Sequence, residues 1–482
     1  MGVSTVTAAR MLAGQLKGGL GEDAWLSFDK FPHTGLSKTY SVNTQVTDSA
    51  ASGTAYLCGV KTDQGMLGVD ARAHRGNCNS ATPERTATSI LRWSADAGKS
   101  TGVVTTARVT HATPAAAYAH VPERGWEGDH NIPSGATCKD IAYQLIFNNS
   151  DINVIMGGGR RFFQKATERD PETGSVNSHY GRHDYNLIDE WAKDKTLKGV
   201  SHKYVWNATD FHNVDPANTD YLLGLFDDSH MQYESDRSSD TGGEPSLAEM
   251  TEKAIEILRK NDKGFFLLVE GERHELASTW VTHATNAYRA LHDTLAFADA
   301  VQRATEMLDS SDSLIVTTAD HSHTFVLAGY GYRGNPILGK AGHDAHMSLA
   351  SDHKPYTPLL YGTGPGFDSA HSSGRPDLSH VDTTDINYQQ EAAVPMSSET
   401  HGGEDVAIYA RGPMAHLFTG VHEQNYIPHV MAFASCVGAY SDPAKCAASL
   451  QPPSNWQRRQ ATSAEEGDED ERFGGKSAFC DA

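Results

Sequence analysis

The sequence has 482 residues, 38% of them hydrophobic, which is enough to bury one large core or two ordinary ones. It contains no apolar run long enough to cross a bilayer, and 61 acidic against 40 basic residues give a formal net charge of −21. No cluster of Lys and Arg is present, which argues against nucleic-acid binding and against an anionic membrane surface. We therefore expect a soluble globular protein, in which an anionic substrate would need local positive charge from metals or a placed arginine.

In chain order, the sequence opens on a helical pattern with apolar residues at Val3, Val6, Met11, Leu12 and Leu16, and not on a signal peptide. Four helix patterns are then each followed by a strand pattern. The helices are expected at 85–97, 138–148, 246–260 and 284–308, and the strands at 100–108, 152–159, 264–271 and 313–321. This alternation predicts an α/β fold, a three-layer sandwich with a large, mostly parallel central sheet. Polar residues gather at the strand ends, where open α/β sheets bind ligands.

The periodicity weakens between about residues 330 and 400, where Gly, Ser, Asp, His and Pro accumulate. We therefore divide the chain into a first part of the α/β domain at 1–329, a surface insertion at 330–400, and the last strands and helix of the α/β domain at 401–450. The remaining residues, 451–482, carry the run EEGDEDER and are expected to form a disordered acidic tail. This tail has no hydrophobic terminus, so we expect no lipid-anchor signal in the chain as written.

The stretch TDSAASGTAYLCGVK at 47–61 is the most informative part of the chain. It begins polar, becomes small, and then turns apolar, which predicts a loop entering a helix. A serine at such an entry meets unpaired backbone amides and the positive end of the helix dipole, so Ser49 is a candidate nucleophile. In the alternative interpretation, Asp48 and Ser49 simply cap the helix. The small residues favour a site, because they allow a substrate or metal to approach closely.

With Asp48 and Ser49 at its head and Cys58 to Lys61 at its end, this stretch resembles the nucleophile segment of alkaline phosphatases. The resemblance extends from Met1 to about Cys446. It implies hydrolysis of phosphate monoesters through a phosphoserine at Ser49. Arg124, in HVPERGW, matches the family's substrate arginine, and a planar guanidinium suits two phosphate oxygens.

The resemblance also implies features away from the reaction. It predicts a homodimer with residues 330–400 as the crown region at its interface, no nucleic-acid partner, and membrane association only if a full-length form is lipid-anchored. It predicts an extracellular location with two disulfides, Cys78–Cys138 and Cys436–Cys446, and a free buried Cys58. Two sequons, at Asn148 and Asn207, permit N-glycosylation.

Candidate zinc ligands lie near the end of the last strand pattern. Asp320 and His321 offer one oxygen and one imidazole, a mixture that suits zinc, although such a pair at a strand end is more often a turn. The family match TADHSH makes them ligands of the zinc nearest Ser49. In the same way His401, in ETHGGEDVAIYARGP, and His283 are implied ligands of a second zinc. Around these ligands we expect three supporting side chains, those of Asp48, His111 and His323.

Two further metal sites follow from the resemblance. Glu270, which ends the strand pattern GFFLLVEG, and Thr113 are implied magnesium ligands, with His111 acting through water. A fourth, calcium-type site would use Glu172, the Phe226 carbonyl, Asp227 and Glu244. The implied cofactors are therefore two zinc ions and one magnesium ion per subunit, with calcium as the fourth metal.

The chain departs from the family pattern in two places. In the family, a strand ending in an aspartate ligand runs into the first helix, so that ligand is expected just before Met1. After Glu270 the chain reads GERHELASTWVTH, about four residues longer than the pattern. One alignment gives His283 as the ligand with Thr279 at the aspartate position, and the other gives Glu275 as the acid and loses the histidine.

A shifted reading frame across residues 277–283 can encode a sequence close to the family pattern, and we hypothesise a local frameshift or mis-spliced gene model. With both carboxylates missing from the zinc ligands, the alternative function is a catalytically impaired or non-catalytic homologue.

Overall fold

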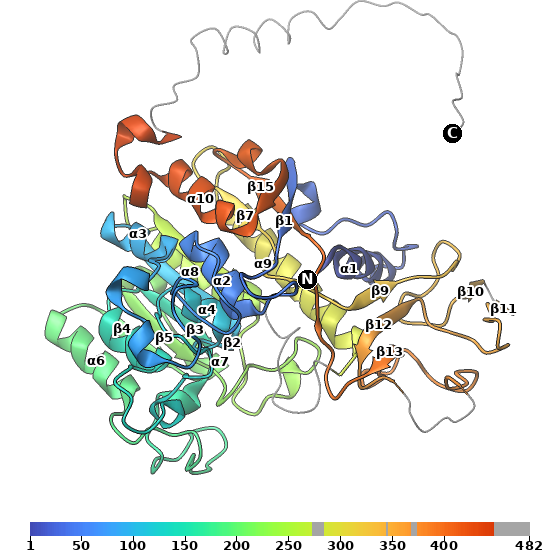
Figure 1. Ribbon diagram of the computed structural model, residues 1–482, viewed down its shortest axis with the longest axis horizontal. Helices are drawn as coiled ribbons and strands as arrows, with labels where there is room; N and C mark the ends of the chain where they lie inside the picture. Colours follow the sequence, from blue (N-terminus) through green and yellow to red (C-terminus); the bar gives the residue numbers. More distant parts are fainter. Residues whose placement is uncertain (272–283, 344–345, 368–373, 448–482) are drawn as a thin grey trace, which may run out of the picture.

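The computed structural model describes residues 1–271, 284–343, 346–367 and 374–447 (Figure 1). The α-helices in this part of the chain are α1 (Val3–Leu16), α2 (Ser49–Cys58), α3 (Ile90–Asp96), α4 (Ala112–Ala116), α5 (Ile141–Tyr143), α6 (Leu187–Lys198), α7 (Ala208–His212), α8 (Leu247–Leu258), α9 (Ala287–Met307) and α10 (Ile427–Ser435). The first strands are β1 (His33–Lys38), β2 (Ser100–Arg108), β3 (Val154–Gly158), β4 (His202–Val205), β5 (Tyr221–Leu225), β6 (Phe265–Glu270), β7 (Ile315–Thr317) and β8 (Ser322–His323). They are followed by β9 (Phe325–Leu327), β10 (Gly342–His343), β11 (His346–Met347), β12 (Leu359–Gly364), β13 (Ala392–Pro395), β14 (His401–Gly402), β15 (Val406–Arg411) and β16 (Gly420–Glu423).

Five parallel strands form the larger sheet, in the order β4-β5-β3-β2-β6. Successive side chains of a strand point to opposite faces, and both faces are covered here. Val103 and Ile155 belong to one buried cluster, whereas their neighbours Val104 and Met156 belong to another. Helix α8 packs against β2, β3 and β6 on the second face. The predicted α/β sandwich with its parallel sheet is confirmed.

A second sheet has the order β16-β1-β15-β7 and is mixed. Strand β7 pairs antiparallel with β15, and β1 pairs antiparallel with β15 but parallel with β16. The predicted strand 313–321 is therefore too long, because β7 ends at Thr317 and the predicted ligands Asp320 and His321 follow it. Pairing with β15 was not visible in the local pattern, since the two segments are far apart in sequence.

A cavity of about 1000 Å³ lies between the two sheets. Its lining includes residues 264–271 around β6 and residues 312–320 around β7, together with Met1 and Thr113. Every residue of β6 is only half-buried, unlike β3 in the middle of the same sheet, which is fully buried. The carboxyl ends of β6 and β7 thus face a common space.

Helix boundaries follow their capping residues. Ser246 and Glu249 form a reciprocal capping box at the start of α8, which matches the predicted helix 246–260. The predicted helix 85–97 begins later, at Ile90, because the Ser89 side chain caps it by accepting a hydrogen bond from the Arg92 amide. The predicted helix 138–148 becomes the short α5 followed by a π-helical segment, Gln144–Asn148.

The two predicted disulfides are present, with Cα–Cα distances of 5.5 Å for Cys78–Cys138 and 5.3 Å for Cys436–Cys446. Cys58 is free and buried, as predicted. Within residues 330–400 the described part carries the short strands β10–β13, which lie at the opposite end of the molecule from the parallel sheet (Figure 1). Among the described helices, none has the length and apolar character needed to cross a membrane.

Candidate active site

Helix α2 begins at the predicted nucleophile. Asp48 is the N-cap residue, and its Oδ1 accepts hydrogen bonds from the amides of Ala51 and Gly65, each at 3.1 Å. Ser49 is the first helical residue and is fully buried. Gly53 lies against α4, where a Cβ would come within 3.0 Å of the Ala116 side chain. Asp48 therefore caps the helix, and the Ser49 hydroxyl does not take part in this capping.

The Ser49 hydroxyl faces His321. Its Oγ lies 3.2 Å from His321 Nε2, and that nitrogen lies 3.1 Å from Asp320 Oδ2. The other ring nitrogen, Nδ1, lies 2.9 Å from the Ser322 carbonyl oxygen. Because a carbonyl can only accept, Nδ1 carries the hydrogen in the neutral ring, and the Nε2 lone pair faces Ser49 and Asp320. This is the tautomer that a metal-binding histidine needs.

His401 is brought to the same place by a short antiparallel ladder in which it pairs with His323. Its ring stacks on His321 with centroids 3.6 Å apart, and its Nδ1 lies 2.7 Å from the Thr47 carbonyl oxygen. By the same reasoning its Nε2 is the nitrogen that can bind a metal. The predicted ligands Asp320, His321 and His401 therefore lie together beside Ser49.

His323 binds a residue that sequence reasoning missed. Its Nδ1 lies 2.5 Å from Oε2 of Glu399, a carboxylate that is only 1% exposed. Burial lowers the pKa of His323, and the nearby Glu399 opposes that change without reversing it. Glu399 stands two residues before His401 in the sequence, and this proximity was the signal that could have found it.

Arg124 links Asp48 and His111. Its Nη1 donates to Asp48 Oδ2 at 3.0 Å, and its Nη2 lies 3.0 Å from His111 Nε2. Asp48 is adjacent to Ser49, so the guanidinium is held next to the serine. The Arg124 side chain is 21% exposed, which leaves it open to a ligand that arrives from solvent.

Thr113 and Glu270 line the cavity between the sheets together with Asp320 and His323. Glu270 Oε2 accepts a hydrogen bond of 2.7 Å from the Thr105 hydroxyl. The Thr113 hydroxyl is buried and has no hydrogen-bond partner among the described residues, an arrangement that a bound cation would satisfy. These donors are oxygen atoms, which is the chemistry that magnesium prefers, so the residues fit the predicted ion.

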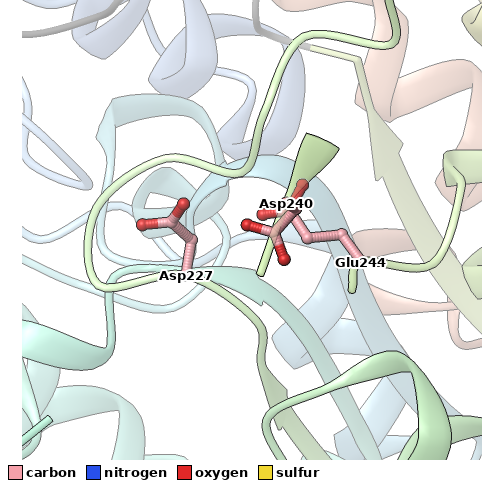
Figure 2. A group of neighbouring side chains, drawn as sticks. All are labelled: Asp227, Asp240 and Glu244. Atoms are coloured by element: carbon pink, nitrogen blue, oxygen red, sulfur yellow. The ribbon is translucent and has the colours of Figure 1, made fainter. Parts of the chain in front are cut away.

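A second group of acidic residues lies away from the serine. Ligand atoms of Asp227, Asp240 and Glu244 lie within 4.8 Å of one another (Figure 2). Asp240 was not predicted, because no local pattern marks it. Its pKa is raised to about 6 by burial and by the nearby carboxylates of Glu172 and Asp227. Oxygen donors of this kind fit the predicted calcium ion.

Other predictions stay untested by this structure. His283 and the divergent segment 272–283 lie outside the described residues, as does the acidic tail 451–482. Of the two sequon asparagines, Asn148 is exposed, whereas Asn207 is half-buried and caps α7.

Comparison with known proteins identifies the family of the chain. A family model described as alkaline phosphatase matches residues 1–437. The tissue-nonspecific alkaline phosphatase of Felis catus is 51% identical over 459 residues, which cover 94% of this chain and 85% of that protein. An alkaline phosphatase of Gadus morhua is 50% identical over 443 residues, covering 91% of this chain and 90% of its own length.

Solved structures share the fold. The alkaline phosphatase of the Antarctic bacterium TAB5 aligns with a TM-score of 0.59 at 22% identity, covering 91% of this chain and 95% of its own. A variant of the TAB5 enzyme, with Mg bound in its M3 site, has the same TM-score at 23% identity and the same coverage. The enzyme of Thermus thermophilus aligns with a TM-score of 0.61 at 22% identity, covering 90% of this chain and 89% of its own.

The family match and the relatives define an enzyme of the phosphoric monoester hydrolase class. The match over most of the chain narrows the class further: this chain belongs to the alkaline phosphatase family.

Proposed function

We propose that this chain hydrolyses phosphate monoesters through a phosphoserine formed at Ser49. The observation that carries the proposal is the contact of 3.2 Å between Ser49 Oγ and His321 Nε2 at the first turn of α2. A buried serine at a helix start, beside an oriented imidazole and a carboxylate, is suited to accept a phosphoryl group.

Candidate metal ligands lie beside this serine. Asp320, His321 and His401, with His283, would hold the two zinc ions, and Thr113 and Glu270 would hold magnesium. When bound, these ions supply positive charge that favours an ionised serine and a departing oxygen anion. Support for metal binding comes from the hydrogen bonds that orient His321 and His401, and from the magnesium bound by the TAB5 variant.

The chain's own residues account for the remaining steps. Arg124 binds two non-bridging phosphate oxygens through its planar fork. Ser49 loses its hydroxyl proton to solvent and its Oγ attacks phosphorus in line. The bond from phosphorus to the ester oxygen breaks, and the alcohol leaves with a proton from solvent. In the second step a water oxygen attacks phosphorus and the Ser49 ester bond breaks. Inorganic phosphate is released and the serine hydroxyl is restored.

The test compares three chromogenic substrates with the metal content of the purified protein. We expect turnover of p-nitrophenyl phosphate, with far slower turnover of p-nitrophenyl sulfate and bis-p-nitrophenyl phosphate, and two zinc ions per chain by elemental analysis. Absence of both turnover and zinc after zinc loading would instead support the non-catalytic homologue.

A calcium ion is the fourth proposed metal. Glu172, the Phe226 carbonyl, Asp227 and Glu244 would bind it, and the proximity of Asp227 to Glu244 supports this placement. Because none of these residues contacts Ser49 in the described structure, we expect calcium to act on stability and not on the reaction.

Assembly and location are further proposals. We propose an extracellular homodimer that is glycosylated at Asn148 and Asn207. The two disulfides support an oxidising compartment. The aromatic side chains of Trp25, Tyr330 and Tyr332 are exposed by 65%, 96% and 59%, and they are candidates for burial in a dimer. Sedimentation analysis should give twice the chain mass.

A further inference from the structure

Glu399 is a buried carboxylate beside the serine site that the proposed reaction does not use. It lies on the segment between β13 and β14, two residues before His401, and only 1% of its surface is exposed. A charged group in such a position is costly unless the protein supplies hydrogen bonds to both of its oxygens. The partners of Glu399 therefore indicate what the residue holds in place.

Both Glu399 oxygens bind the segment that contains the candidate zinc ligands Asp320 and His321. Oε1 accepts hydrogen bonds from the Thr324 amide at 2.5 Å and from the Thr324 hydroxyl at 2.7 Å. Oε2 lies 2.5 Å from His323 Nδ1. Because an ionised carboxylate can only accept, Nδ1 is the donor in this contact. One side chain thus fixes the backbone at Thr324 and the orientation of the His323 ring.

The His323 ring packs against the two candidate zinc ligands. Its centroid lies 5.5 Å from that of His321 and 5.5 Å from that of His401, with interplanar angles of 61° and 70°. The His321 and His401 rings are themselves stacked, with centroids 3.6 Å apart. The edge of one ring thus supports a stack of two others. A rotation of His323 would remove this support from both ligands.

The backbone connection between these residues is short. Strands β8 and β14 form a ladder of two residue pairs, His401 with His323 and Gly402 with Ser322. A two-stranded ladder of this length has little stability of its own. The bonds from Glu399 to Thr324 continue the connection beyond the ladder, because one residue precedes β14 and the other follows β8.

We propose that Glu399 is a positioning residue, which holds His323 and β14 in the arrangement that lets His321 and His401 bind zinc. The inference rests on the proposed function and adds a residue to it. Glu399 would act through His323 and Thr324, and would touch neither the substrate nor the metal. Carboxylates that orient the histidines of a metal site commonly change metal affinity by about 10-fold to 100-fold when they are removed.

The experiment measures zinc affinity of the purified full chain by competition with a chromogenic chelator. In E399Q the side chain keeps its size but has a single accepting oxygen, so it can bind Thr324 or His323 and not both. We expect E399Q to bind zinc at least about tenfold more weakly than the unmodified chain. Thermal melts in the presence of excess chelator compare the stabilities of the metal-free proteins.

D140N is the matched control for the loss of a buried carboxylate. Asp140 is 3% exposed, caps α5 and accepts two hydrogen bonds from Arg182. We expect D140N to lower the melting temperature but to change zinc affinity by less than about twofold. E399D is a second variant, which keeps the charge and moves the carboxylate back by one methylene group. It should also weaken zinc binding, and it tests the proposal if E399Q does not fold.

Two further measurements separate positioning from general stability. With excess zinc, E399Q should recover most of its kcat, and its KM for p-nitrophenyl phosphate should stay within about twofold, because Glu399 does not contact the substrate. In an H323A background, E399Q should weaken zinc binding by less than about twofold, since the two residues act as a unit.

The outcomes distinguish this inference from the proposed function. If the unmodified chain binds zinc and turns over substrate, but E399Q and E399D bind zinc equally well, the inference alone is wrong. It is also wrong if E399Q lowers only the melting temperature, as D140N does, or if its effect on zinc affinity is undiminished in H323A. If the unmodified chain neither binds zinc nor turns over substrate, the proposed function is wrong and the inference fails with it.

Discussion

The serine site and the acidic group offer different kinds of side chain to a cation. At the serine site, His321 and His401 each direct Nδ1 toward a backbone carbonyl, so that Nε2 is available as a ligand. In the acidic group, Asp227, Asp240 and Glu244 are like charges held close together. The first arrangement combines imidazoles with the Asp320 carboxylate and is oriented by hydrogen bonds, whereas the second consists of carboxylates alone and is suited to cross-linking two chain segments. Metal loss should therefore affect activity at one site and stability at the other.

Selective metal removal gives the largest expected difference. A zinc chelator should reduce kcat by more than about 100-fold, because the ions supply the charge for phosphoryl transfer, and added zinc should restore it. Calcium removal should instead lower the melting temperature. Calcium at about 100 times its dissociation constant contributes about 2.7 kcal/mol to folding stability. If a calcium-selective chelator reduced the activity as much as the zinc chelator does, the proposed difference between the two sites would be wrong.

Arg124 should be the next most sensitive position. We expect Arg124→Ala to reduce kcat/KM for p-nitrophenyl phosphate by about 100-fold, or about 2.7 kcal/mol, because the guanidinium binds two phosphate oxygens. Arg124→Lys should recover only part of this loss, since an ammonium group is not a planar fork. Arg75, which pairs with Glu123 on the surface nearby, is the matched control. An Arg75→Ala variant as impaired as Arg124→Ala would argue against a substrate role.

The Thr113 hydroxyl should be needed for magnesium and for nothing else in the fold. Thr113→Val should weaken magnesium binding by about tenfold, measured as the concentration that gives half-maximal activation, with little change in melting temperature. Thr101 is the control, because its hydroxyl is also buried without a described hydrogen-bond partner but lies on β2, outside the cavity lining. Equal effects of Thr101→Val and Thr113→Val would remove Thr113 from the site.

Cys58 should be chemically silent although it ends the helix that Ser49 begins. Burial raises the pKa of its thiol to about 12, so the thiolate fraction at pH 8 is negligible. We expect no alkylation of native protein by iodoacetamide at pH 8, and complete alkylation after denaturation without reductant. Rapid native labelling, detected by mass spectrometry of the Cys58 peptide, would show that this end of α2 opens.

Local sequence patterns predicted the parts of the fold that local forces determine. The apolar runs of β2 and β6 and the capping box of α8 were placed to within about two residues, because burial and capping act within each segment. The length of β7 was wrong because its partner β15 lies about ninety residues away in sequence, as the register Tyr409↔Thr317 shows. A short stretch of sequence does not show which distant strand it will pair with.

The same distinction holds for the site. Ser49, Asp320 and His401 were predicted as site residues from motifs that continue over many residues and resemble a known family. Glu399 and Asp240 were missed because each becomes notable only when distant segments meet, Glu399 against His323 and Asp240 against Asp227. These two residues could be recognised only from their positions in the folded structure.

The most direct test of the central claim is to trap the phosphoryl group on the enzyme. Acid quenching during turnover of p-nitrophenyl phosphate, followed by proteolysis and mass spectrometry, should add one phosphoryl group to the peptide that contains Ser49. The Ser49→Ala variant should show no such adduct and no turnover. Phosphorylation of a different residue during turnover, or turnover by Ser49→Ala at the rate of the unmodified chain, would contradict the account.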